Sequence, residues 1–219
     1  PSLNKREYID ALLSVRYFYR YEPFNTQYIP EGFRLKEKNN KTEIYENMNF
    51  IPFGYTYDRA ICRTVFDSIY RTDPLKNRCN ILLSSIVLEK QDWEKYHSFF
   101  RYKGIDTTLN VTWLSRERNK NASSFFQGNS TGFTSEINLP EENLIFFSVP
   151  YDSGFSATVN GKESPIIKAN ISFMAVKGNK GKNTIIFKYI PPGLKSGILI
   201  SIYTLIIFIG YMGIQIFYS

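Results

Sequence analysis

The chain has 219 residues, which is enough for one large domain or for two small domains that each bury a core. It contains 27 basic and 20 acidic side chains, a formal net charge of +7, but the Lys and Arg residues are scattered and form no block. This scatter excludes the clustered basic patch typical of a nucleic-acid-binding protein, and leaves attraction to an anionic membrane or wall polymer open.

Residues 1–103 mix strand and helix patterns. The first residue is Pro1 rather than Met, and we therefore expect the chain to be the tail of a longer protein. Aromatic residues alternate with arginines over residues 15–21, which predicts a strand. Residues 33–36 and 42–45 flank a turn-forming Lys-Asn-Asn-Lys segment and predict two more strands.

Two amphipathic helices are expected next. Apolar side chains recur at helical spacing over residues 61–70 and again over residues 75–86. Asp73 and Pro74 stand before the second run as an N-cap and a first-turn proline, and a third helical pattern covers residues 92–100. Cys62 and Cys79 fall within the two apolar stripes, so we expect them to be small core residues, with a disulfide between them as the alternative.

From about residue 105 the helical period disappears, and short alternating runs separated by Gly, Asn, Pro and Ser indicate a sandwich. Residues 133–137 alternate, and the apolar run 144–149 predicts a central strand. Residues 155–159 lead into Asn160-Gly161, the strongest short hairpin signal. A second hairpin is expected to join residues 171–176 to residues 184–190 through a Gly-Asn-Lys-Gly turn.

A stretch without charged side chains, residues 197–218, closes the sequence. As a helix it would be about 33 Å long, enough to cross the hydrocarbon core of a bilayer, whereas the core helix of a soluble protein seldom runs so far without a polar face. The predicted fold class is therefore α+β. It comprises a mixed α/β part over residues 1–103, an antiparallel, jelly-roll-like β-sandwich over residues 104–192 and one transmembrane helix over residues 197–218.

The sequence shows no recognisable catalytic constellation. His97 is the single histidine, which excludes a multi-histidine metal site, and no phosphate-binding loop, dinucleotide fingerprint or CxxC motif is present, so neither a metal nor a cofactor is predicted. The adjacent acids Glu141 and Glu142 are interpreted as a solvated turn. Asn-x-Ser/Thr triplets begin at Asn40, Asn110, Asn121, Asn129 and Asn170, as chance allows in so Asn-rich a chain.

Two segments, residues 52–58 and 150–155, combine aromatic, acidic and glycine residues. A saccharide needs a flat apolar surface for its C–H face and a carboxylate or amide for its hydroxyls. The carbohydrate-binding candidates are Tyr55, Tyr57, Asp58, Tyr151, Asp152 and Phe155. The alternative is a pair of turns in which each Asp caps backbone N–H groups while the aromatic rings pack below.

An ordered series of segments resembles the C-terminal region of YfhO-type bacterial membrane proteins. The matching residues are 12–17, 51–58, 148–155, 160–162, Asn170 with Phe173 and Met174, 180–182, 187–189 and 191–194. Phe155 stands where Trp is expected, which weakens sugar stacking there, and Asn160 stands where Asp is commoner.

This resemblance implies a polytopic protein similar to the GT-C glycosyltransferases, which move a sugar from a polyprenyl-phosphate carrier to an acceptor such as teichoic acid. The catalytic acid of that class lies in an early outer loop, so no catalytic residue is expected in this chain. The implied location is the bacterial cell membrane, with the folded part extracytoplasmic. The implied partners are the upstream transmembrane region, the lipid bilayer, the polyprenyl-phosphate sugar and the envelope glycan.

Two roles remain open for the folded part. It could position the acceptor or glycan, or it could be a non-catalytic structural or partner-docking domain. A free-standing hydrolase anchored by its tail is disfavoured, because the sequence offers no catalytic group for it.

Overall fold

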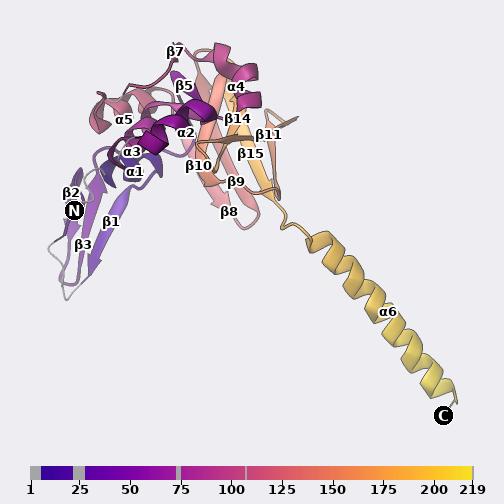
Figure 1. The fold of residues 1–219 in the computed structure, drawn as a ribbon. Coiled ribbons are helices and arrows are strands. Elements are labelled where there is room, and N and C mark those ends of the chain that lie inside the picture. The colour runs from indigo at the N-terminus through magenta and orange to yellow at the C-terminus, as the bar shows by residue number, and fades with distance from the viewer. Residues whose placement is uncertain (1–5, 22–27, 73–74, 107, 219) are drawn as a thin grey trace.

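The computed structural model describes residues 6–21, 28–72, 75–106 and 108–218, and shows an α+β body from which one long helix projects (Figure 1). The α+β prediction is thus confirmed, and Asp73 and Pro74, the predicted helix start, lie outside the described residues. The helical segments are α1 Arg6–Leu12, α2 Arg63–Thr72, α3 Leu75–Ser84, α4 Lys90–Tyr96, the 3-10 helix η1 His97–Phe99, α5 Val111–Lys120 and α6 Leu194–Tyr218.

A small antiparallel sheet forms near the N-terminus, with the strand order β1-β3-β2. Its strands are β1 Tyr17–Tyr21, β2 Phe33–Lys38 and β3 Thr42–Asn47, which confirms all three strands expected in this region. The Asn39 side chain closes the turn between β2 and β3, because its Oδ1 accepts the backbone N–H groups of Lys41 and Thr42 at 3.0 and 2.8 Å.

The largest sheet has seven strands in the order β4-β10-β14-β13-β6-β5-β7. β5 pairs in parallel with β6 and β7, and the other pairs are antiparallel. The strands are β4 Tyr55–Thr56, β5 Arg59–Cys62, β6 Ile86–Leu88, β7 Tyr102–Lys103, β10 Asn143–Pro150, β13 Ile167–Ala169 and β14 Phe173–Gly178. Strands from both sides of residue 104 share this sheet, so the two predicted parts are joined by hydrogen bonds; their division into subdomains stays a prediction.

A third, wholly antiparallel sheet has the order β12-β11-β15-β9-β8. Its strands are β8 Phe125–Asn129, β9 Gly132–Leu139, β11 Phe155–Val159, β12 Lys162–Ser164 and β15 Gly181–Tyr189. It packs on β10 and β14 through one apolar cluster, which forms the interior of a sandwich. The Asn160-Gly161 hairpin is confirmed between β11 and β12, with φ of 52° and 77° at the two turn residues, as a type I′ turn requires.

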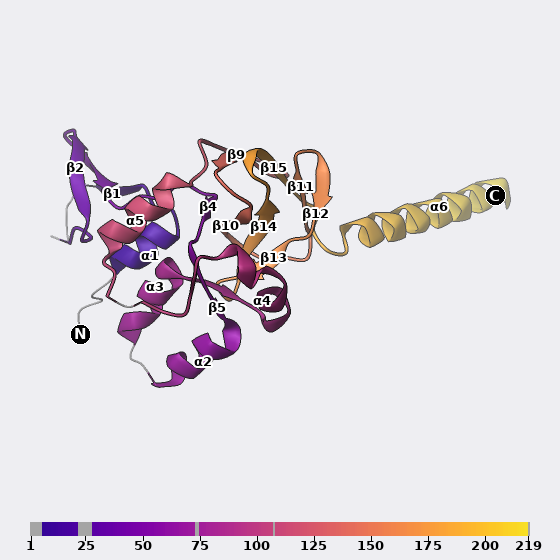
Figure 2. The same ribbon diagram turned by 90° about the horizontal axis from the view of Figure 1, so that it is seen from above.

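β10 is the strand on which both layers depend. Leu144 and Phe146 point to the core shared with the helices, whereas Ile145 and Phe147 point into the sandwich. All four side chains are fully buried, which confirms the central strand predicted from the unbroken apolar run. The helices α1, α3 and α5 contact one another and supply the other side of the first core (Figure 2).

The second predicted hairpin is wrong. β14 pairs with β10 and β13, whereas β15 pairs with β11 and β9, so the chain crosses from one sheet to the other between them. The Asn183 amide holds this crossing, because it accepts the Asn179 N–H at 2.9 Å and donates to the carbonyls of Asn179 and Gly181 at 2.7 and 2.9 Å. Two strand-forming segments that flank a Gly-rich turn have the same sequence pattern whether they pair as a hairpin or belong to different sheets.

The two main helix predictions and the third helical pattern are confirmed by α2, α3 and α4, but α5 was not predicted. Asn110 caps it, with Oδ1 accepting the Trp113 N–H at 2.8 Å. Cys62 ends β5, Cys79 lies on α3, and these two described residues are not joined in a disulfide.

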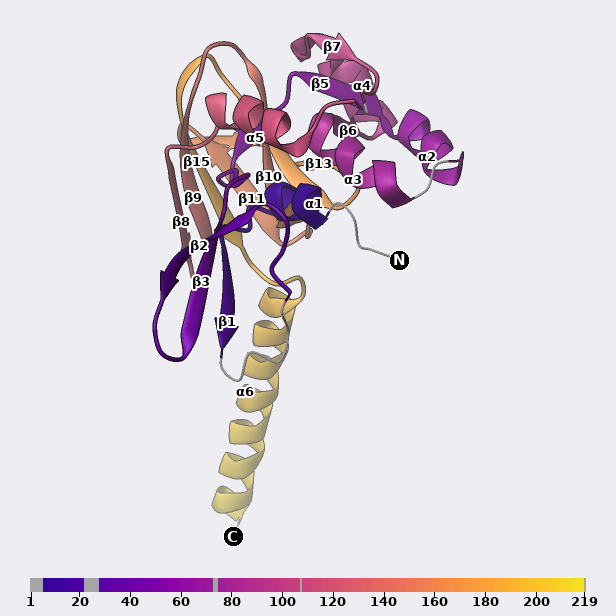
Figure 3. The ribbon, with the colours of Figure 1, turned by 90° about the vertical axis from the view of Figure 1, so that its left-hand side faces the viewer.

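Helix α6 runs away from the body with its whole length exposed (Figure 3). It begins three residues earlier than predicted. Among the described residues it is the helix that is long and apolar enough to cross a membrane, and no part of its most apolar stretch is buried. A soluble protein would bury such a helix, so the fold supports the membrane-spanning interpretation.

Candidate functional site

The first candidate segment lies inside the molecule. Tyr55 and Tyr57 are 0% and 1% exposed, and their rings lie 5.3 and 5.6 Å from the ring of Phe146 on β10. These rings therefore offer no face to a sugar in this fold. Their place in the core follows from β4, which pairs with the buried strand β10.

The two phenol groups are hydrogen-bonded within that core. Tyr57 Oη donates to the carbonyl of Leu82 at 2.8 Å and accepts from Asn170 Nδ2 at 3.0 Å, and the Tyr55 hydroxyl lies 3.3 Å away. Burial raises the pKa of Tyr57 to about 12 and raises the pKa of Tyr55 well above its ordinary value. Both groups stay neutral at physiological pH and act as structural hydrogen-bond partners.

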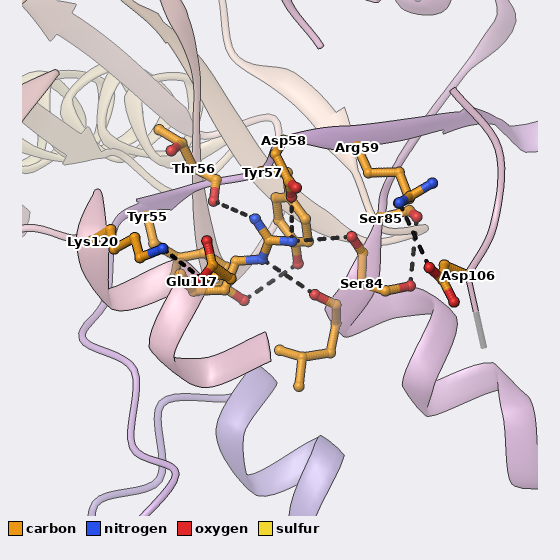
Figure 4. Close-up of polar contacts among 12 residues, drawn as sticks. Tyr55, Thr56, Tyr57, Asp58, Arg59, Ser84, Ser85, Asp106, Glu117 and Lys120 are labelled. Carbon is orange, nitrogen blue, oxygen red and sulfur yellow. Dashed lines mark hydrogen bonds and ion pairs between the residues drawn. The ribbon is translucent and has the colours of Figure 1, made fainter. Parts of the chain in front are cut away.

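Arg118 on α5 organises the surroundings of these tyrosines. Figure 4 shows Tyr57, Asp58 and Ser84, which belong to this cluster, close together. The Arg118 side chain is 3% exposed, and the guanidinium lies 4.6 Å from the centre of the Tyr57 ring. It donates to the backbone carbonyls of Thr56 at 3.2 Å, Ser84 at 3.1 Å and Leu83 at 3.4 Å. Because carbonyls of both α3 and β4 accept from this one cation of α5, Arg118 joins α3 and α5 to the edge of the seven-stranded sheet.

Asp58, the acidic candidate of the first segment, is the partner of that cation. Its Oδ1 accepts from Arg118 Nη2 at 2.6 Å, and about a third of its side chain is exposed. The neighbouring Arg59 faces Asp106 at 3.8 Å. A carboxylate held by a buried guanidinium is suited to fixing the fold, and the ion pair leaves it little freedom to bind sugar hydroxyls.

The second candidate segment follows β10 and reaches the surface. Tyr151 is 41% exposed, whereas Phe155 packs on the sandwich core and lies 4.7 Å from the ring of Tyr189. Asp152 Oδ1 accepts the Gly154 N–H at 2.7 Å, which is the turn geometry foreseen as the alternative. Tyr151 is thus the aromatic candidate that has a ring open to solvent.

This second segment adjoins the start of the membrane helix. Ser153 and Gly154 line a hollow of about 260 Å³ together with residues 190–193, Lys195 and Ser196. The six candidates do not converge on one site, because Tyr55 and Tyr57 lie in the core on the helix side of the large sheet and Phe155 packs on the sandwich side.

No group of three or more His, Cys, Asp or Glu side chains among the described residues could hold a metal ion. The His97 ring contacts Trp93, and its Nδ1 lies 3.0 Å from the Trp93 carbonyl, so it serves as a local packing group.

Comparison with known proteins gives one consistent result. Residues 108–201 match the family model described as "Bacterial membrane protein YfhO". These residues form a YfhO-family membrane protein region. The uncharacterized protein YfhO of Bacillus subtilis (strain 168) is 32% identical over 84 residues, which is 38% of this chain and 10% of that relative's length. No solved structure matches the chain.

The YfhO-matching region starts just before α5 and ends inside α6, so it contains Arg118 and the complete sandwich layer. Sequence analysis missed two residues that organise the interior, Arg118 and Asn170. Asn170 has a positive φ of 45° and accepts the Val87 N–H at 2.8 Å while donating to Tyr57. In the sequence, Asn170 stands out only as the start of an Asn-x-Ser triplet and as part of the YfhO resemblance, because its hydrogen-bond partners are far away along the chain.

Proposed function

We propose that this chain is the extracytoplasmic C-terminal region of a polytopic membrane glycosyltransferase. The parent protein would transfer a sugar from a polyprenyl-phosphate donor to a cell-envelope polymer such as teichoic acid. This part would position the acceptor and would carry no catalytic group of its own. The observation that carries the proposal is a YfhO-family region whose folded body continues directly into a membrane-compatible helix.

The connection between body and helix supports a role close to the bilayer surface. Strand β15 ends at Tyr189 and α6 begins at Leu194, so few residues separate them. In the proposed arrangement, a membrane-bound acceptor would pass close to the hollow beside the start of α6 and to the turn that contains Tyr151. Tyr151 precedes the lining residues Ser153 and Gly154 in the same turn, and an exposed tyrosine ring can hold the C–H face of a sugar.

Exchange of Tyr151 for Ala in the full-length protein tests this role. If the ring holds the acceptor, Tyr151→Ala should lower sugar transfer about tenfold, the usual cost of losing one stacking contact of 1–1.5 kcal/mol. Tyr102→Ala is a matched control, because Tyr102 is 40% exposed and lies on β7 at the other end of the body (Figure 1). Transfer should be measured with donor and acceptor in liposomes.

The second role, a structural or docking domain, is favoured by the burial of Tyr55 and Tyr57 and by the turn that occupies Asp152. It predicts that Tyr151→Ala and Tyr102→Ala leave transfer equally unchanged. It also predicts that the body supports the assembly or abundance of the upstream transmembrane region, measurable by immunoblotting of the parent protein with and without residues 1–192.

A further inference from the structure

A polar groove is lined by residues of α5, of α1, of β2 and of the segments next to β2 and β3. Figures 1 and 2 show that α5 and β2 lie at the end of the body far from α6. We call this groove the α5 groove and define it by Gly32 and Arg34 of the β2 segment, Asn49, and Ser115, Arg116 and Asn119 of α5. Its volume is about 490 Å³, within the range of about 300–1,000 Å³ typical of small-molecule sites. None of the predicted site residues lines it.

A buried hydroxyl group, that of Ser115, lies at the floor of the groove. Ser115 is 3% exposed, and its Oγ has no hydrogen-bond partner among the described residues. A buried polar atom without a partner costs about 1–3 kcal/mol, so such atoms call for an explanation. The Oγ atom itself is covered in this structure, so a ligand in the groove would provide the missing partner after a small shift of the neighbouring side chains.

The backbone around the floor leaves room for close approach. Gly32 has a φ of 82°, and a Cβ added there would lie 3.0 Å from Nδ2 of the buried Asn49. Asn119 is held in place because its Nδ2 donates to the carbonyls of Phe50 and Ser115, each at 2.9 Å. The floor is therefore a fixed arrangement of amide and hydroxyl groups.

Three charged side chains line the groove, the cations Arg34 and Arg116 and the acid Glu7 of α1, so positive charge is in excess by one. Arg34 and Arg116 both line the groove, and neither forms an ion pair with another described residue, whereas most arginines of the small sheet and helices are paired. Guanidinium groups bind phosphate through paired, charge-assisted hydrogen bonds. Phe33 and Met48 add apolar surface to the same groove, as the C–H face of a sugar requires.

We infer that the α5 groove binds a phosphorylated saccharide, with Arg34 and Arg116 on the phosphate and the Ser115 hydroxyl and the neighbouring amides on the sugar hydroxyls. The inference deepens the proposed function and rests on it for the source of the ligand, a phosphate-bearing part of the envelope glycan. The groove would then be a second contact with the polymer, separate from the one proposed at Tyr151.

Binding of glucose 6-phosphate to the complete chain in detergent micelles tests the inference by calorimetry, with glucose and inorganic phosphate as comparison probes. Glucose 6-phosphate should bind saturably and more tightly than either probe. Arg34→Gln and Arg116→Gln should each weaken binding about tenfold, the loss expected for one charge-assisted contact, and Arg101→Gln, at an exposed arginine outside the groove, should not. Equal affinity of all variants, or of glucose 6-phosphate and inorganic phosphate, would overturn the inference.

Ser115→Ala separates a ligand role from a structural one. If the hydroxyl is kept for a ligand, Ser115→Ala should leave the melting temperature of the free chain equal or higher while weakening glucose 6-phosphate binding severalfold. Unchanged affinity, or a lowered melting temperature, would show that the hydroxyl serves the fold instead. These measurements need no transfer activity, so the two proposals can fail separately. Unchanged transfer in the Tyr151→Ala protein together with the expected glucose 6-phosphate binding would contradict the role of Tyr151 alone. Lowered transfer in that protein together with no specific binding would contradict the groove inference alone.

Discussion

At the residue scale, Arg118 shows how hydrogen bonds and an ion pair can compensate a charge that is buried inside a protein. Its guanidinium meets three backbone carbonyls, one carboxylate and the face of one aromatic ring. Isolated burial of an arginine would be very costly, so the neighbours must supply the hydrogen bonds that water would otherwise give. The consequence is a residue that the fold cannot easily replace.

Exchange of Arg118 for Met should lower the free energy of unfolding by about 3 kcal/mol, because Asp58 and three carbonyls lose their donor together. Chemical denaturation of the chain in detergent, followed by tryptophan fluorescence, measures this loss. The exposed Arg101→Met serves as a control and should change the value by no more than about 0.5 kcal/mol. Equal stability of both variants would contradict the central role of Arg118.

At the element scale, the small sheet depends on one carboxylate of β3. Glu43 is paired with Arg20 of β1 and, at 2.8 Å, with Lys38 of β2, and it accepts the Tyr45 hydroxyl at 2.8 Å. These contacts tie the outer strands to the middle one. Lys38 first, then Tyr45 and Arg20, lower the pKa of Glu43 to about 2.

A lowered pKa in the folded state means that the contribution of Glu43 to stability is present above pH 4.5, its ordinary pKa, and is lost as the pH falls toward about 2. The amide hydrogens of β1, β2 and β3 should therefore lose protection against exchange over this window, measured relative to the intrinsic exchange rate at each pH. Glu43→Gln should exchange faster already at pH 7 and respond less to acid. A wild-type sheet with the same protection at pH 3 and pH 7 would disagree with this assignment.

Helix α5 depends on its cap. Asn110→Ala should cost about 1 kcal/mol of stability, because the Trp113 N–H loses its partner. Asn110→Asp is the matched control and should retain the cap and the stability. Thermal unfolding of the three proteins, followed by circular dichroism, measures the difference. If the cap stabilises α5, the melting temperature of Asn110→Ala should be lower than that of Asn110→Asp. Identical melting temperatures would contradict a stabilising role of the cap.

The sequence predicted elements better than their arrangement. Strong local signals, such as the apolar run of β10 and Asn160-Gly161, led to correct strands and a correct hairpin. The α5 helix was missed because its apolar stripe is short and charged residues surround it, and the layer change between β14 and β15 was missed because pairing partners are set by distant strands. For the candidate site, composition identified the two segments, but burial of Tyr55 and Tyr57 depends on contacts that no local pattern contains.

At the scale of the whole molecule, β10 makes the helical layer and the sandwich layer interdependent. Alternate side chains of this strand enter the two cores, so a change in its backbone disturbs both. We therefore regard the body as one cooperative unit, despite the two kinds of pattern along the sequence.

Helix α6 should control the behaviour of the purified chain. With its apolar surface exposed, the chain should require detergent and sediment with liposomes. Replacement of Ile206 and Ile207 by Asp should release it from liposomes, because each acid near the helix centre costs about 2.5–3.5 kcal/mol on insertion. Replacement of the same two residues by Leu should leave sedimentation unchanged. If the chain stays monomeric in buffer without detergent and does not sediment with liposomes, the membrane-spanning assignment is refuted.

The short stretch between Tyr189 and Leu194 has a mechanical meaning. A short connection restricts the movement of the body relative to the helix, so the body should tilt when the helix tilts. Helices tilt when their apolar length exceeds the local thickness of the hydrocarbon layer. A thinner bilayer would thus increase the tilt of the helix and move the end of the body that lies far from α6. The lipid composition would in this way affect the height of the α5 groove above the membrane.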